Sequence, residues 1–261
     1  MVLTIKNGEF EMDYFKFGNG KKNMIIIPGV SIKSVMESEE IIKNAYKLFS
    51  NDFTIYVFDR KKKMEKSYNI FNMADDLIKT IDGLGLKDLY ALGASQGGMI
   101  ALIIAIKRGD LIKKLNVNST TAFVTHDKYL LFDELINLSI NNKLLDMVKL
   151  FCKKAYSNEL YESVKDSLLP FVNSINENDI NNFIIESEAL KDFNILNDLD
   201  KIKCDTFIIA SKLDQIFDYN DSITLNNKIK NSKLFLYDKY GHDVYDEALD
   251  IKNRIYDFYM E

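Results

Sequence analysis

The sequence predicts an α/β protein in which about eight strands form a mostly parallel sheet with helices on both faces. From about residue 24 to 121, and again from 199 to 261, short apolar runs alternate with longer segments of helical periodicity. Strands separated by helices become parallel neighbours whose two faces are both covered. From about 123 to 198 the periodicity is helical with no convincing strand. We therefore expect a core of residues 1–122 and 199–261, with a helical cap, 123–198, inserted after the sixth strand.

The individual elements follow from local patterns. Strand-like runs at 2–6 and 9–17 flank Asn7-Gly8, a dipeptide that favours a two-residue hairpin turn. The helix predicted over 70–84 carries Met73, Leu77 and Ile81 on one face. Apolar runs predict further strands at 24–27, 53–58, 89–92, 115–118, 206–210 and 234–237. Helical stretches are predicted at 34–49, 96–107, about 221–229 and about 243–259.

Composition restricts the partners and the compartment. The 261 residues are 47% hydrophobic and 28% charged, with a net charge of −5, which suits one large domain or a domain with an inserted lid. The lysines at 61–63 form a short run that we expect in a solvated loop, and no longer basic block suggests nucleic acid as a partner. No apolar run approaches the roughly 20 residues that cross a membrane. The first residues lack the apolar core of a signal peptide.

The two cysteines, Cys152 and Cys204, lie far apart and form neither a metal-binding spacing nor a disulfide framework. A reducing cytoplasm is therefore the expected location. No cofactor is expected from these patterns.

The main chemical signal is the pattern Gly-x-Ser-x-Gly at Gly93, Ser95 and Gly97. It follows an apolar strand and opens an apolar helix, the context in which a sharp turn exposes a strained serine as a nucleophile. A structural turn in which the serine only caps the helix is the alternative. We expect Ser95 to be the nucleophile.

A serine hydroxyl needs a base to accept its proton, and the chain has two histidines. His242 follows the last predicted strand, so its loop leaves the same edge of the sheet as the Ser95 turn. His126 begins the helical insert, where capping a helix or contacting substrate is the more natural role. We expect His242 to be the base.

The third group orients the histidine and follows the serine in the chain. Asp214 lies after the strand at 206–210, on the same edge of the sheet, and is the predicted acid. Asp218, four residues further along, is the alternative and is expected to open the next helix. Asp205 precedes its strand and so belongs to the opposite edge.

An oxyanion needs two fixed donors. The backbone N–H of Gln96, directly after the serine, is one candidate. The loop after the strand at 24–27 contains Pro28-Gly29, and the backbone N–H of Val30 is the other. An ordinary Pro-Gly turn is the alternative for this loop.

With these residues assigned, nearly the whole chain resembles the α/β-hydrolase superfamily. The stretch from 71–77 through Gly85 to 93–98 is similar to the family's helix, strand and nucleophile turn. Segments 208–214 and 240–243 resemble its acid-bearing strand and its histidine loop. Serine at position 95 separates the chain from the dehalogenase and epoxide-hydrolase branches, which use Asp there. The chain has Pro28-Gly29 where many relatives have His-Gly, and lysines rather than a Gly-rich segment after Asp59-Arg60.

The resemblance implies cleavage of an ester, thioester, amide or lactone, and in some branches carbon–carbon cleavage or perhydrolysis. We expect a small apolar carboxylic ester or lactone to be cleaved through an acyl-enzyme on Ser95. A thioesterase or small-amide hydrolase with the same triad, and a ligand-binding protein without turnover, are the alternatives. The oligomeric state is left open.

Overall fold

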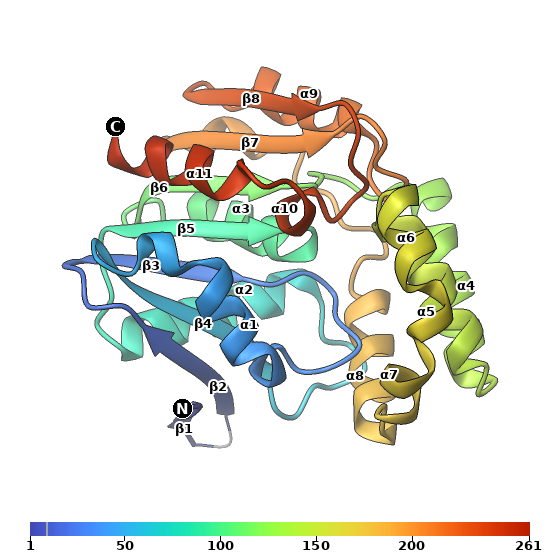
Figure 1. Cartoon of the computed structure of the whole chain (residues 1–261). Coiled ribbons are helices and arrows are strands. Elements are labelled where there is room, and N and C mark those ends of the chain that lie inside the picture. Colours follow the sequence, from blue (N-terminus) through green and yellow to red (C-terminus); the bar gives the residue numbers. More distant parts are fainter. Residues whose placement is uncertain (9) are drawn as a thin grey trace.

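A computed structural model describes residues 1–8 and 10–261 and contains one eight-stranded sheet in the order β1-β2-β4-β3-β5-β6-β7-β8 (Figure 1). The pairings β1–β2 and β2–β4 are antiparallel, and the others are parallel. The prediction of an eight-stranded, mostly parallel sheet is confirmed. The strands are β1 (Leu3–Asn7), β2 (Phe10–Phe17), β3 (Lys22–Ile27), β4 (Phe53–Lys61), β5 (Leu89–Ala94), β6 (Ile112–Asn118), β7 (Asp205–Ser211) and β8 (Ser232–Tyr237).

The first hairpin differs by one residue from the predicted one. Asn7 pairs with Phe10, so Asn7 closes the ladder and does not belong to the turn. Gly8 follows it with φ of 63°, a conformation that favours glycine. The predicted start of the second strand, residue 9, lies outside the described residues.

Each face of the sheet has its own apolar core. Along β3, Met24 and Ile26 belong to one buried cluster, whereas Ile25 and Ile27 belong to the other. Successive side chains of a strand point to opposite faces, so a continuous apolar run marks a strand that is covered on both. The first cluster packs under α11 (Ile251–Met260), and the second packs under α2 (Ile70–Gly83), α3 (Gln96–Lys107) and α9 (Tyr219–Lys228).

Two predicted helices are divided. The segment predicted as a helix at 34–49 consists of the 3₁₀ turn η1 (Val35–Ser38), helix α1 (Glu39–Ala45) and the 3₁₀ turn η2 (Lys47–Phe49). Tyr46 and Phe49 are both buried, and a 3₁₀ turn aligns residues that are three apart. The last predicted helix is likewise divided, into α10 (Val244–Glu247) and α11.

The helical insert lies between β6 and β7, as predicted. It contains α4 (His126–Ile140), α5 (Leu144–Ala155), α6 (Asn158–Val164), the 3₁₀ turn η3 (Lys165–Ser167), α7 (Leu169–Asn173) and α8 (Glu177–Glu188). Figure 1 shows these helices together beside the arrowhead ends of the central strands. Phe132, Met147 and Phe183 of the insert belong to the same buried cluster as Val117 of β6 and Ile208 of β7. The cap boundaries at 123 and 198 stay a prediction.

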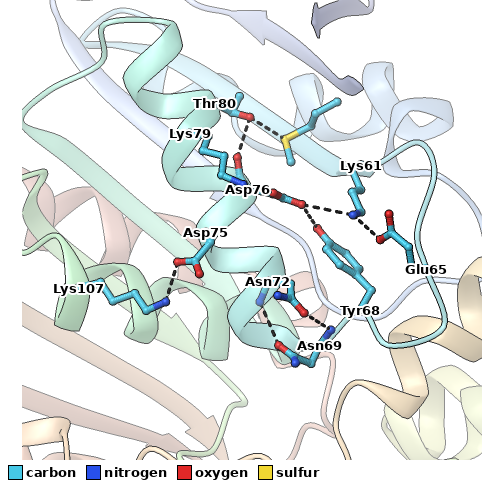
Figure 2. A network of polar contacts seen from close by, with 11 residues as sticks. Lys61, Glu65, Tyr68, Asn69, Asn72, Asp75, Asp76, Lys79, Thr80 and Lys107 are labelled. Atoms are coloured by element: carbon cyan, nitrogen blue, oxygen red, sulfur yellow. Dashed lines mark hydrogen bonds and ion pairs between the residues drawn. The ribbon is translucent and has the colours of Figure 1, made fainter. Parts of the chain in front are cut away.

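Polar contacts attach the segment after β4 to helix α2 (Figure 2). The Tyr68 hydroxyl donates to Asp76 Oδ2 at 3.1 Å, and Lys61 Nζ lies 4.4 Å from the centre of the Tyr68 ring. Asn69 caps α2 in a reciprocal capping box with Asn72. Lys61 is part of β4 and its side chain is only 17% exposed, so the expectation of a solvated lysine loop is wrong for this residue.

Cys152 and Cys204 are free thiols, and burial raises the pKa of each to about 11. Over residues 1–8 and 10–261, no helix is long and apolar enough to cross a bilayer. In the same residues, no three or more His, Cys, Asp or Glu side chains are grouped so as to hold a metal ion.

Candidate active site

Ser95 occupies the turn between β5 and α3 in a strained backbone conformation. Its φ of 52° and ψ of −123° are unusual for a residue with a side chain. The Ser95 N–H donates to the carbonyl oxygen of Asn118 at 2.9 Å. The Thr120 hydroxyl donates to the Ser95 carbonyl oxygen at 2.7 Å. The neighbouring strand end therefore holds the turn from both sides of the serine.

The two flanking glycines are required by close backbone packing. A Cβ atom on Gly93 would lie 2.4 Å from the Gly97 carbonyl oxygen. A Cβ atom on Gly97 would lie 2.0 Å from the carbonyl oxygen of Ile27, in β3. Any side chain at either position would force the turn away from its neighbours.

Asp214 and His242 meet after β7 and β8. His242 Nδ1 lies 2.8 Å from Asp214 Oδ2, and the two side chains are 4% and 1% exposed. The other oxygen of Asp214 accepts hydrogen bonds from the backbone N–H groups of Ile216 at 2.8 Å and Phe217 at 3.0 Å. A carboxylate is an acceptor, so Nδ1 carries the shared proton and Nε2 is left for the cavity.

The charge state of His242 depends on opposing influences. Burial lowers its pKa, but the Asp214 charge, the hydrogen bond to Asp214 and the Asp243 charge together raise the pKa above its ordinary value. Burial also raises the pKa of the Asp243 carboxyl to about 6, although His242 and a hydrogen bond from Tyr245 act in the opposite direction. The imidazolium is therefore favoured beside these carboxylates.

Ser95 and His242 line one small cavity of about 70 Å³. Val30 also lines it, and a Cβ atom on the preceding Gly29 would lie 3.0 Å from Ser95 Cβ, so this loop passes directly against the serine. Gln96, directly after the serine, is fully buried. The remaining lining residues are Phe132, Phe151, Ile216, Asp243 and Tyr245.

The alternative residues lie elsewhere. His126 is exposed at the first turn of α4, which Thr125 caps. Asp218 caps α9 by accepting a hydrogen bond from the Asn220 N–H at 2.8 Å, as expected for a residue that opens a helix. Asp205 begins β7, at the opposite end of the strand from Asp214. None of the three lines the Ser95 cavity.

Several residues near the site had no assigned role in the sequence. Asp243 adjoins His242 and accepts a hydrogen bond from the Tyr245 hydroxyl at 2.7 Å. Arg60 and Glu186 are buried charged residues behind the Pro28-Gly29 loop. Burial raises the pKa of Glu186 to about 7, whereas the Arg60 charge and a backbone hydrogen bond at Ser31 lower it. Arg60 had a signal in its Asp-Arg pair, but Glu186 stands in an ordinary helical pattern.

Comparison with known families shows which family the chain belongs to. A family model described as the alpha/beta hydrolase fold matches residues 23–249, which is most of the chain. The chain belongs to the alpha/beta hydrolase family. This hydrolase is 25% identical over 208 residues to the putative carbamate hydrolase RutD of Stutzerimonas stutzeri, covering 74% of this chain and 76% of the relative.

Two solved structures share the fold of this hydrolase along its length. MGS-M2, an alpha/beta hydrolase from a Medee basin deep-sea metagenome library, aligns with a TM-score of 0.88 and 20% identity, covering 99% of this chain and 98% of the other. The esterase EaEST from Exiguobacterium antarcticum aligns with a TM-score of 0.84 and 20% identity, covering 100% of each chain.

Proposed function

We propose that the protein cleaves a small carboxylic ester or lactone through an acyl-enzyme formed on Ser95. The observation that carries the proposal is the Asp214–His242 hydrogen bond, 2.8 Å long, beside a cavity that His242 shares with Ser95. A strained serine, then a buried carboxylate and then a histidine along the chain are the parts of a nucleophilic triad.

Each proposed step has a residue to perform it. Ser95 Oγ attacks the carbonyl carbon while His242 Nε2 takes its proton, and Asp214 stabilises the imidazolium. The backbone N–H groups of Val30 and Gln96 donate to the oxyanion. The tetrahedral intermediate then collapses, and His242 gives its proton to the departing alcohol. Water, activated by the same histidine, releases the acid and restores Ser95.

The cavity lining supports an apolar acyl group. Val30, Phe132, Phe151 and Ile216 are apolar, and two of them come from helices α4 and α5 of the insert. We propose that the insert acts as a cap that selects the acyl chain. The same triad also suits a thioester or a small amide, and a similar protein is named as a putative carbamate hydrolase.

Labelling with a fluorophosphonate tests the proposal. The reagent reacts fast only with a serine that has a base and oxyanion donors, so a single adduct is expected on the peptide containing Ser95. Ser95→Ala is expected to abolish labelling and turnover. His242→Ala should slow both by orders of magnitude, while His126→Ala serves as the matched histidine control. Well-folded protein without an adduct would point to a ligand-binding role, and an adduct on another serine would overturn the site.

A substrate panel distinguishes the alternatives. Esters, lactones, thioesters and amides that share one acyl group are compared by kcat/KM, because the acyl pocket is then constant and only the leaving group varies. A preference for the thioester or the amide would replace the ester proposal and leave the triad in place.

For location we propose the cytoplasm, because both cysteines are free thiols. Recovery of the native protein outside the cytoplasmic fraction would contradict this.

A further inference from the structure

A buried arginine contacts the backbone on which the proposed oxyanion donors lie. Arg60 is 7% exposed, near the end of β4. Its Nη2 donates to the carbonyl oxygen of Pro28 at 2.9 Å and makes a longer contact of 3.4 Å with that of Gly29. The same nitrogen donates to Gln96 Oε1 at 3.0 Å. Arg60 thus touches the loop before Val30 and the residue directly after Ser95.

The contact of Arg60 with the Gly29 carbonyl also determines the direction of the Val30 N–H. The Gly29 carbonyl and the Val30 N–H belong to one planar, trans peptide unit, so they point in opposite directions. Arg60 contacts the carbonyl oxygen of this unit and also donates to the carbonyl oxygen of Pro28, in the peptide unit before it. The Val30 N–H is consequently directed away from Arg60, and Val30 itself lines the Ser95 cavity.

The Gln96 side chain links this arrangement to the helical insert. Its Oε1 accepts from Arg60, and its Nε2 donates to the carbonyl oxygen of Glu186, in α8, at 2.7 Å. The partners determine the orientation of the amide, because a flipped amide would place two donors against each other and two acceptors against each other. Helix α8 is thereby attached to the residue that follows Ser95.

Stability alone does not explain the cluster of Arg60, Gln96 and Glu186. Glu186 Oε2 lies 4.0 Å from Arg60 Nη2, and both side chains are more than nine-tenths buried. Among the described residues, Arg60 Nε and Glu186 Oε2 have no hydrogen-bond partner. Buried charges with incomplete partners destabilise a fold, so they are typically found where function requires them.

The chain directly after Arg60 is held in place by the contacts of Figure 2. Lys61 lies over the Tyr68 ring and 3.9 Å from Asp76 of helix α2, while the Tyr68 hydroxyl donates to the same carboxylate. The guanidinium therefore extends from a strand end that is anchored on its other side to α2.

We infer that Arg60 is a positioning residue that, together with the Gln96 side chain and helix α8, aims the Val30 and Gln96 N–H groups at one point beside Ser95 Oγ. This inference rests on the proposed function. It assigns the insert a second role, because α8 supports the oxyanion donors, whereas α4 and α5 line the Ser95 cavity.

The test is Arg60→Lys, which keeps the charge but lacks the planar fork of the guanidinium. Misplacing catalytic groups by about 1 Å costs on the order of 100-fold in rate. We therefore expect kcat on a short ester to fall roughly 10- to 100-fold, with KM within about twofold. Arg108→Lys is the matched control, because Arg108 pairs with Asp82 and Asp110 at the surface.

A pair of ketones separates positioning from general damage. Ser95 Oγ adds to the carbonyl carbon of a trifluoromethyl ketone and forms an oxyanion. The methyl ketone of similar shape binds largely with its carbonyl group intact. Arg60→Lys should lower the affinity for the trifluoromethyl ketone by the same factor as it lowers kcat, and should leave the affinity for the methyl ketone unchanged. Gln96→Met, of similar shape but without the amide, should act in the same direction and replaces Arg60→Lys if that variant does not fold.

The outcomes are distinct. The inference would be overturned if kcat and the affinity for the trifluoromethyl ketone were unchanged in both variants. A rise in KM alone, or an equal loss of affinity for the two ketones, would also overturn it. Wild-type protein without a fluorophosphonate adduct on Ser95 would overturn the proposed function itself, and the inference with it. An adduct together with unaffected variants would overturn the inference only.

Discussion

At the scale of single residues, Asp214 serves two purposes with its two oxygens. One oxygen holds His242 Nδ1, and the other accepts the N–H groups of Ile216 and Phe217. Its side chain is 1% exposed. Chain order and strand ends favoured Asp214 over Asp218, and Asp214 is the residue that contacts His242, while its role as the acid stays a prediction.

Asp214→Asn is expected to lower kcat by about 10⁴, because the amide favours the wrong histidine tautomer while preserving shape. Ester hydrolysis and the circular dichroism spectrum would be measured together. Asp218→Asn is the matched control and should affect chemistry little, since Asn also caps helices well. The assignment is wrong if the control is the damaging change.

The pH dependence of kcat/KM follows from the state of His242. Proton acceptance requires the neutral imidazole, and the neighbouring carboxylates raise the His242 pKa above its ordinary value despite burial. The protonated, inactive form therefore persists to higher pH, and activity should fall on acidification through an apparent pKa above about 6.5. An inflection below that value would contradict the raised His242 pKa, and a flat profile from pH 5 to 8 with chemistry rate-limiting would contradict the base assignment.

Arg60 and Glu186 show what the sequence could not reveal. They come from β4 and from α8 and are 126 positions apart in the sequence. No motif marks Glu186, and a glutamate in a helix is typically at the surface. Only the packing of α8 against the core places its carboxyl among Arg60, Asp59 and the backbone of Ser31.

Glu186 makes the stability of the fold depend on pH. With its pKa raised from 4.5 to about 7, the folded protein keeps a proton between these values that the unfolded chain has lost. The unfolding free energy therefore falls as pH rises through this window, by on the order of 3 kcal/mol in total. Glu186→Gln removes this ionisation. Relative to wild type, we expect the variant to be more stable at pH 8 than at pH 5.

Urea unfolding at the two pH values checks this expectation. Glu188→Gln is the matched control on the same helix, because Glu188 is exposed. If the two glutamine variants show the same pH dependence, burial of Glu186 has no such effect on stability.

At the scale of secondary structure, elements defined by apolar periodicity were predicted well. Helix α3 begins and ends at the predicted residues, because ten of its twelve positions are buried and the pattern is nearly continuous. The segment at 34–49 was predicted as one helix because helical periodicity does not distinguish an α-helix from short 3₁₀ turns. Burial of Tyr46 and Phe49 in the same apolar cluster determines the outcome.

Helices α4 and α5 each contribute a phenylalanine to the cavity. Phe151→Ala should enlarge the acyl site and raise kcat/KM for longer acyl chains relative to acetate. The change expected is roughly 1–3 kcal/mol per methylene. Phe171→Ala, on α7, is the matched control, because Phe171 is 39% exposed and does not line the cavity. An unchanged chain-length profile for Phe151→Ala would exclude α5 from acyl selection.

At the scale of the whole molecule, the insert and the sheet form one structure. A single apolar cluster includes residues of both, and the Asp243 N–H donates to the carbonyl oxygen of Ala155 in α5 at 2.9 Å. Composition and periodicity predicted that an insert exists. They did not predict how firmly it is attached, because the contacts join the histidine loop to a helix end distant in sequence.

Gly241 is the position where this attachment is closest. A Cβ atom there would lie 2.6 Å from the backbone of Ala155 and Tyr156. Gly241→Ala should therefore separate α5 from the histidine loop, destabilise the fold by roughly 1–3 kcal/mol and reduce activity. Thermal unfolding with a parallel ester assay checks both effects. Gly83→Ala is the control, because its new methyl would meet only the flexible end of Ile5.

The cavity beside Ser95 has a consequence for timing. Its volume of about 70 Å³ is well below the roughly 300 Å³ or more that sites for small organic ligands usually enclose. For the proposed ester substrates, we therefore expect that a long acyl chain enters, and its acid leaves, only when α4 and α5 move apart. We expect turnover of such substrates to be limited by how often the protein opens, so that two esters of equal reactivity would be hydrolysed at rates that differ with the opening each one needs.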